Sequence, residues 1–134
     1  MQPRIVEELS LLRGAYADVQ HKEAGGQDWF LLPTYLFPDG WLLGATPIIR
    51  APICFPINVG YPGAQPYSFS TPAGITFRGQ PPVNAKETQA PPFDGQWCEF
   101  SWQPEEWKPT GDVRKGSNLL IWARGFAARL REGV

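Results

Sequence analysis

Apolar residues recur with a helical spacing near the start of the chain. Ile5, Leu9, Leu12, Tyr16 and Val19 follow one another at intervals of four, three, four and three residues. This spacing places them along one stripe of an α-helix. We therefore expect an amphipathic N-terminal helix, and we expect the pair Gly25-Gly26 to end it.

The middle of the chain alternates between apolar runs and turn residues. Runs at 29–37, 41–43, 48–59 and 67–70 are rich in the aromatic and aliphatic residues that favour strands. Pro33 cannot donate a ladder hydrogen bond, so the first strand should lie at an edge or carry a bulge. Pro38-Asp39-Gly40 has the composition of a hairpin turn between the first two runs. Together the runs predict an antiparallel meander of three to four strands.

The rest of the chain is a long irregular segment and then a second helix. From Thr71 to Asp94 most residues are Pro, Gly, Gln, Thr or Asn, and irregular segments of this length in compact domains are often functional. The later helix is predicted because apolar residues again recur at intervals of four, three and four, at Leu119, Ala123, Phe126 and Leu130.

Capping residues support that last helix and complete the element order. Ser117 or Asn118 can cap its start, and Gly133 lies just beyond its end. The predicted order is an N-terminal helix, an antiparallel β-meander, a long irregular segment and a C-terminal helix. This is an α+β layout, with helices against one side of a sheet.

Length and charge exclude several classes of protein. A chain of 134 residues suits one domain, here residues 1–134. Twelve basic and 13 acidic side chains leave a net charge of -1, so we expect no nucleic-acid partner. The sequence has neither a signal peptide nor a long apolar span, which predicts a cytoplasmic protein without a membrane partner.

Two cysteines and one histidine limit the redox and metal chemistry of the chain. In a reducing compartment Cys54 and Cys98 are expected to be free thiols rather than a disulfide. One His and two Cys are too few for a four-ligand structural zinc site unless carboxylates contribute, so no metal and no cofactor is expected. Cys54, between Ile53 and Phe55, reads as a core residue.

Cys98 is the strongest candidate for chemistry. It lies in an aromatic, turn-rich segment, GQWCEFSW, from Gly95 to Trp102, which is unlike an ordinary strand. A thiolate is the most nucleophilic group that a protein has without a cofactor. The alternative is that Cys98 is a small buried hydrophobe, as many free cysteines are.

Three short motifs resemble the ubiquitin-conjugating (E2) superfamily. The segment from Tyr61 to Phe69, YPGAQPYSF, is similar to the Tyr-Pro, Pro-Pro, Phe pattern that ends the E2 meander. Gly95-Gln96-Trp97-Cys98 resembles the Gly-x-x-Cys entry to the E2 active site, and Trp107-Lys108-Pro109 begins nine positions after Cys98. The resemblance covers residues 5 to 132 and implies a UBC-like fold.

The chain is most similar to a bacterial E2-like branch that is encoded beside a ubiquitin-like protein, an E1-like enzyme and a JAB-type metalloprotease. The motifs shared with that branch are Leu32-Pro33, Gly60-Tyr61-Pro62, Gly95-Gln96-Trp97, Phe100-Ser101 and Trp107. The resemblance implies a transferase for antiviral defence. Cys98 would accept the ubiquitin-like protein from the E1-like enzyme as a thioester and pass it to an amine on a target protein.

The sequence departs from the E2 pattern upstream of the cysteine. Position 90 is Ala, where eukaryotic members have the Asn of His-Pro-Asn, and the nearest Asn is Asn84. Asn84 is therefore a candidate oxyanion donor. Asp94 and Asp112 are candidates for deprotonating the incoming amine.

Two other functions remain open at this point. An inactive E2 variant would bind the ubiquitin-like protein or the E1-like enzyme without carrying it, as the missing His-Pro-Asn suggests. A Cys-His hydrolase would use Cys98 and His21, which requires the two side chains to lie within hydrogen-bond reach. We place His21 at the end of the first helix, where a solvated side chain is the simpler expectation.

Overall fold

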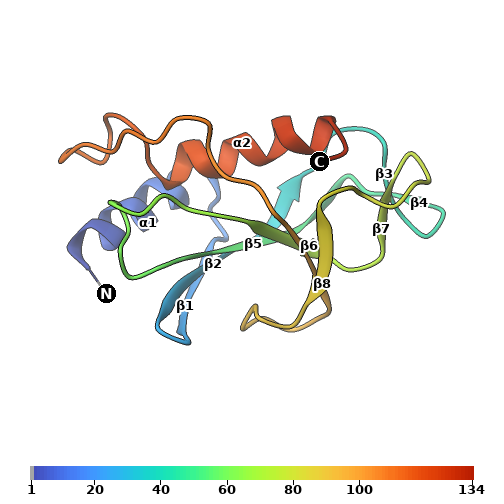
Figure 1. Ribbon diagram of the computed structural model, residues 1–134, viewed down its shortest axis with the longest axis horizontal. Coiled ribbons are helices and arrows are strands. Elements are labelled where there is room, and N and C mark those ends of the chain that lie inside the picture. The colour runs from blue at the N-terminus through green and yellow to red at the C-terminus, as the bar shows by residue number, and fades with distance from the viewer. Residues whose placement is uncertain (1) are drawn as a thin grey trace.

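A six-stranded antiparallel sheet forms the centre of the protein (Figure 1). The computed structural model describes residues 2–134. The strands lie in the order β1-β2-β5-β6-β9-β8. Their bounds are Gln20–Ala24 for β1, Gln27–Leu36 for β2, Arg50–Ile57 for β5, Phe69–Pro72 for β6, Trp97–Phe100 for β9 and Ala85–Thr88 for β8.

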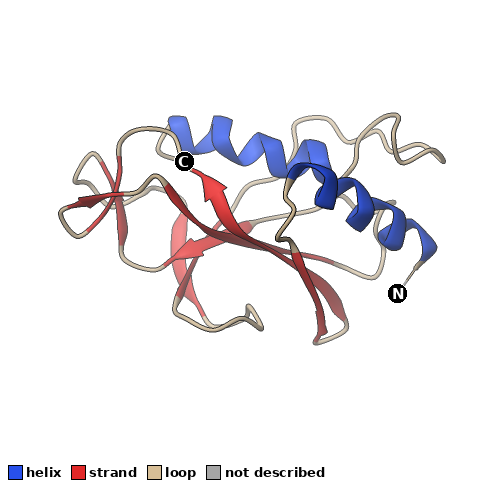
Figure 2. Ribbon diagram, turned by 180° about the vertical axis from the view of Figure 1, so that it is seen from behind, coloured by secondary structure: helices blue, strands red, loops and turns tan. Residues whose placement is uncertain are grey.

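A small second sheet and two helices complete the α+β fold. The second sheet has the order β4-β3-β7, with β4 at Thr46–Pro47, β3 at Trp41–Leu43 and β7 at Ile75–Phe77. The helices are α1, Pro3–Ala15, and α2, Leu119–Arg131. Both lie along one side of the large sheet (Figure 2). Within residues 2–134 neither helix has the length and apolar character needed to cross a bilayer.

Aromatic rings between the large sheet and α2 form a central part of the core. Phe30, Phe55, Phe69 and Phe100 come from four strands of the sheet, and each is fully buried. Phe126 of α2 stacks on Phe69 with 4.5 Å between ring centroids. Rings in such stacked or tilted pairs stabilise the fold beyond the area that they bury. The helical side of the sheet is therefore the principal hydrophobic layer.

The other side of the sheet carries a smaller apolar cluster. It consists of Trp29, Cys54, Phe93 and Trp97. Phe93 comes from the segment between β8 and β9, and its carbonyl accepts a 3.2 Å hydrogen bond from the Trp97 indole nitrogen. Cys54 is fully buried there, as expected, and burial raises the pKa of its thiol well above the ordinary range.

A buried carboxylate joins the two helices. Glu8 of α1 is 1% exposed and accepts hydrogen bonds from Arg4 Nε at 2.8 Å, the Tyr61 hydroxyl at 2.6 Å and the Leu119 backbone N–H at 2.6 Å. Leu119 is the first residue of α2, where a helix presents free N–H groups and positive potential. A charge can be buried only when it is paired in this way.

The C-terminal helix and the bulge were predicted correctly. The Asn118 side chain accepts a 2.8 Å hydrogen bond from the Ile121 N–H, which makes Asn118 the cap. Gly133 follows the helix with a φ of 78°. The β2–β5 register shifts between Leu32 and Tyr35, so Pro33 sits in a bulge, although β2 is not an edge strand.

The predicted end of the first helix was wrong. The helix ends at Ala15, and Gly25-Gly26 instead forms the turn between β1 and β2, with φ of 59° and 79°. His21 therefore lies on a strand and not at a helix end. Strand β1 is an edge strand with the polar sequence QHKEA and no buried residue, so it shows no apolar alternation.

The structure also has more strands than the predicted meander. β1, β2, β5 and β6 are consecutive neighbours and form a four-stranded meander. Trp41–Leu43 does not pair with β2, because the turn at Pro38-Asp39-Gly40 directs it into the second sheet. The segment 71–94, predicted to be irregular, contains β7 and β8. Cys98 itself lies on β9, so its segment is a strand after all.

We predict that replacing Glu8 by Ala lowers the free energy of unfolding by about 3–5 kcal/mol, because the Arg4 guanidinium and two other buried donors lose their acceptor. Urea denaturation followed by far-UV circular dichroism would measure this loss. Glu7 is exposed on the same helix, so Glu7→Ala should change stability by less than about 0.5 kcal/mol. Equal effects of the two substitutions would contradict the role of Glu8.

Candidate functional site

Cys98 lies in the interior of the strand ladder, beside the edge strand β8. Its register partners are Thr71 on β6 and Glu87 on β8. Thr71 is fully buried, Cys98 is half-buried and Glu87 is exposed. The three residues form one rung that runs from the core to solvent.

The electrostatic surroundings of Cys98 disfavour its thiolate form. Burial raises the pKa of its thiol, and the negative charges of Glu87 and Glu99 raise it further. Lys86 lies on the edge strand β8, but its ammonium group forms an ion pair with Glu99, at 3.4 Å from a carboxylate oxygen. Because the thiolate is the reactive form, these surroundings lower the reactivity of Cys98 relative to that of a fully solvated cysteine.

A small hollow adjoins the Cys98 rung. It has a volume of about 180 Å³. Its walls come from the ends of β8 and β9 and from the turn after β6, and the lining residues are Ala73, Glu87, Thr88, Gln89, Gln96 and Trp97. Glu87 is therefore both the cross-strand neighbour of Cys98 and part of the wall of this hollow.

The structure does not bring the other predicted site residues into register with Cys98. The Asn84 carbonyl accepts a 3.0 Å hydrogen bond from the N–H of Ser101, the residue after β9. Ser101 is three residues from Cys98, which is about 10 Å along an extended chain. Asp94 is exposed in the turn before β9. Asp112 belongs to the loop before α2, where its carboxylate accepts a 3.0 Å hydrogen bond from the Arg114 N–H. Their roles in transfer stay predictions.

The position of His21 removes the Cys-His hydrolase. His21 is on β1, at one edge of the sheet, and Cys98 is on β9, four strands away. Neighbouring strands are about 4.8 Å apart, which separates the two backbones by roughly 19 Å. This is far beyond the hydrogen-bond reach that a nucleophile and its general base require.

Two of the sequence motifs contact each other directly. The Trp107 indole nitrogen donates a 2.8 Å hydrogen bond to the Pro62 carbonyl, and the Trp107 ring lies 5.7 Å from the Tyr61 ring. Tyr61 in turn donates to Glu8. The Tyr-Pro turn, the Trp-Lys-Pro segment and α1 are therefore parts of one packed unit.

The segments that carry these motifs run beside each other. The Ser68 N–H donates a 2.7 Å hydrogen bond to the Trp102 carbonyl, and the Gln65 amide nitrogen is 3.0 Å from the Gln103 side-chain oxygen. The stretch that leads from Cys98 to Trp107 is thus anchored along the turn that precedes β6.

Sequence reasoning missed a cluster on the β1–β2 hairpin. His21, Glu23 and Asp28 each offer a ligand atom, and these three atoms lie within 4.8 Å of one another. The signal was present in the spacing. His-x-Glu places two side chains on one face of a strand, and an acid that follows a tight turn can return to the same face. Glu8 was missed as well, because nothing in a helical pattern marks one surface-type residue as buried.

No protein-family model, curated protein or solved structure matches this chain.

We predict that Glu87→Gln makes Cys98 react about two- to fivefold faster with iodoacetamide at pH 7.5. Removing the negative charge across the rung lowers the thiol pKa and so raises the thiolate fraction. Mass spectrometry of the alkylated protein would give the rate. Asp94→Asn, which removes an exposed charge outside the rung, is the matched control. Equal rates for wild type and Glu87→Gln would show that Glu87 does not restrain the thiol.

Proposed function

We propose that this protein is an E2-like conjugating enzyme for a bacterial ubiquitin-like protein. It acts in the cytoplasm, in a pathway of antiviral defence. Its partners are the ubiquitin-like protein, an E1-like activating enzyme and a target protein. The observation that carries the proposal is the 2.8 Å hydrogen bond from Trp107 to the Pro62 carbonyl. It joins the two motifs that flank Cys98 in sequence and on which the resemblance to E2 enzymes depends.

The order of the elements supports the same function. A helix comes first along the chain, antiparallel strands follow it, the cysteine-bearing segment comes next, and a second helix ends the order. This is the order that the resemblance implies. Strand β8 lies within residues 71–94, where an irregular segment was predicted, and its pairing with β9 gives Cys98 a fixed position beside the sheet edge.

The chemistry consists of two exchanges at the Cys98 sulfur. First, the thiolate attacks the thioester carbonyl between the ubiquitin-like protein and the E1 cysteine; a new carbon–sulfur bond forms and the E1 thiol leaves. Then an amine of the target attacks that carbonyl, an amide forms, and Cys98 leaves with its electron pair and regains a proton. ATP is consumed by the E1-like enzyme, so Cys98 itself requires no metal or nucleotide.

The raised pKa of Cys98 fits a carrier better than a hydrolase. A thiol of high pKa is mostly protonated and does not attack indiscriminately, yet its thiolate is intrinsically more nucleophilic once formed. In the second exchange the attacking amine must lose a proton. Glu87, directly across the ladder, is the nearest carboxylate by register, and we assign it this role ahead of Asp94 and Asp112.

One observation favours a second candidate, an inactive E2 variant that only binds its partners. The register partners of Cys98 are a buried threonine and an acid, and neither is an amide donor for an oxyanion. A protein of this kind would hold the ubiquitin-like protein or the E1-like enzyme without forming a covalent bond to it.

We predict that the protein, mixed with the E1-like enzyme, ATP and the ubiquitin-like protein, forms a one-to-one adduct that dithiothreitol cleaves. Non-reducing gel electrophoresis would detect it. Cys98→Ser should form an ester that resists dithiothreitol but yields to alkali, because the hydroxyl replaces the thiol in the same exchange. Cys98→Ala should form no adduct.

Cys54→Ala is the matched control, since Cys54 is fully buried on the other side of the sheet, and its adduct should be unchanged. A reductant-labile adduct that persists in Cys98→Ala would overturn the assignment. Stable binding of either partner without any adduct would establish the binding module instead.

A further inference from the structure

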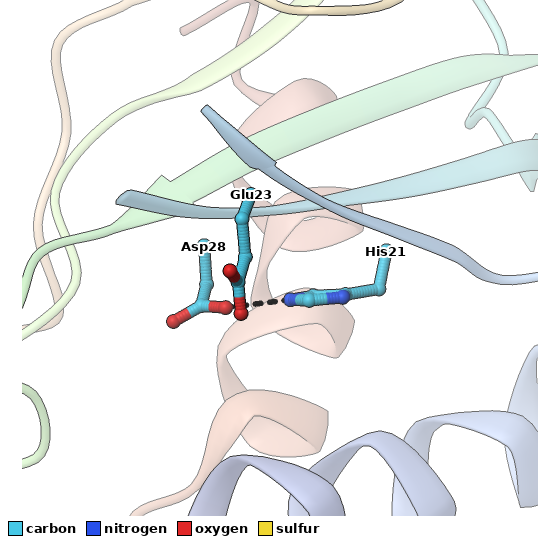
Figure 3. Close-up of side chains that lie close together, drawn as sticks. All are labelled: His21, Glu23 and Asp28. Atoms are coloured by element: carbon cyan, nitrogen blue, oxygen red, sulfur yellow. Dashed lines mark hydrogen bonds and ion pairs between the residues drawn. The ribbon is translucent and has the colours of Figure 1, made fainter. Parts of the chain in front are cut away.

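The hairpin formed by β1 and β2 brings three potential metal ligands to one face. His21 and Glu23 are two residues apart on β1, so their side chains share a face of the strand. Asp28 on β2 is the direct register partner of Glu23. The three side chains converge in Figure 3, where the Glu23 carboxylate lies beside the pair formed by His21 and Asp28. The backbone register produces this convergence.

The distances suit a small divalent ion after slight adjustment. His21 Nε2 is 2.6 Å from Asp28 Oδ1, and the three ligand atoms all lie within 4.8 Å of one another. Zinc binds nitrogen and carboxylate oxygen at about 2.0–2.2 Å in tetrahedral geometry, which places its ligand atoms roughly 3.3 Å apart. Small side-chain rotations therefore convert the present arrangement into a coordination shell.

The charges at this place favour a cation. Glu23 and Asp28 lie directly opposite each other across an antiparallel pair, where like charges are destabilising. A divalent ion would stabilise both carboxylates at once.

The site is held in place and accessible. The His21 ring packs against Phe30 at 5.2 Å between centroids. Phe30 is fully buried, so the core restrains one side of the imidazole. At the turn, a hollow of about 300 Å³ borders Glu23 and Asp28 and gives an ion a path from solvent. A site for an exchangeable metal ion requires ligands that are held by packing and a path from solvent to the ion.

We propose that His21, Glu23 and Asp28 form a site for Zn²⁺, with a fourth position open to water. Three protein ligands with one open position are typical of zinc sites that are not purely structural. A nitrogen ligand and only two carboxylates disfavour Ca²⁺, which takes six to eight oxygen ligands, and Mg²⁺, which requires near-octahedral oxygen coordination. The ion would join the edge strand β1 to β2. It lies at the opposite edge of the sheet from Cys98, so the site is independent of the proposed transfer reaction.

Isothermal titration of the tag-free full chain with ZnCl₂ tests this site. We expect one equivalent of Zn²⁺ to bind and to raise the thermal unfolding temperature. Glu23→Gln and Asp28→Asn should each weaken binding by more than about 100-fold, because loss of a direct ligand exceeds the 10- to 100-fold effect of losing an outer partner. Glu23 is exposed, so its substitution leaves the fold intact.

Two control variants separate this site from other zinc-binding groups. Cys98→Ser removes the half-buried thiol, and Glu132→Gln removes an exposed carboxylate elsewhere. Both should bind Zn²⁺ as wild type does. The proposal is overturned if wild type binds no Zn²⁺, if Glu23→Gln and Asp28→Asn bind as tightly as wild type, or if Cys98→Ser abolishes binding.

Discussion

The buried carboxylate of Glu8 is the interaction on which the arrangement of the two helices depends. One side chain accepts hydrogen bonds from its own helix, from the Tyr61 turn and from the first N–H of α2. The desolvation of a carboxylate is costly, and only this full set of donors offsets it. Three segments that are distant in sequence therefore meet at this one carboxylate.

The segments next to the candidate active site are connected to Glu8 through Tyr61. Tyr61 lies between Glu8 and Trp107, so the turn that receives the buried charge also receives the segment that follows Cys98. The same segment is hydrogen-bonded along the strand entry at Ser68. The rung of Thr71, Cys98 and Glu87 is thus fixed at one side by the core and at the other by a short edge strand.

The sequence predicted the elements whose signals are local. Helix α2 was recognised from its periodicity and its Asn118 cap, and Pro33 marked a bulge because it lacks an N–H. Strands β1 and β8 were missed, since edge strands such as QHKEA and AKET bury no alternating apolar face. The partners of Cys98 depend on how β9 pairs, and pairing between distant segments leaves no local signal. No metal was expected from the sequence; the site proposed at the Gly25-Gly26 hairpin uses two carboxylates, Glu23 and Asp28, that were not among the candidate residues.

Strand β8 is an edge strand of the large sheet, and it pairs with β9, the strand that carries Cys98. Its four residues pair with β9 alone, so it has no second neighbour to hold it. Edge elements of this kind open more readily than the rest of a sheet. If β8 detached, Glu87 would move away from Cys98 and the thiol would become more exposed, and both changes would remove causes of its raised pKa. The protonation of this cysteine thus depends on the pairing of one short strand.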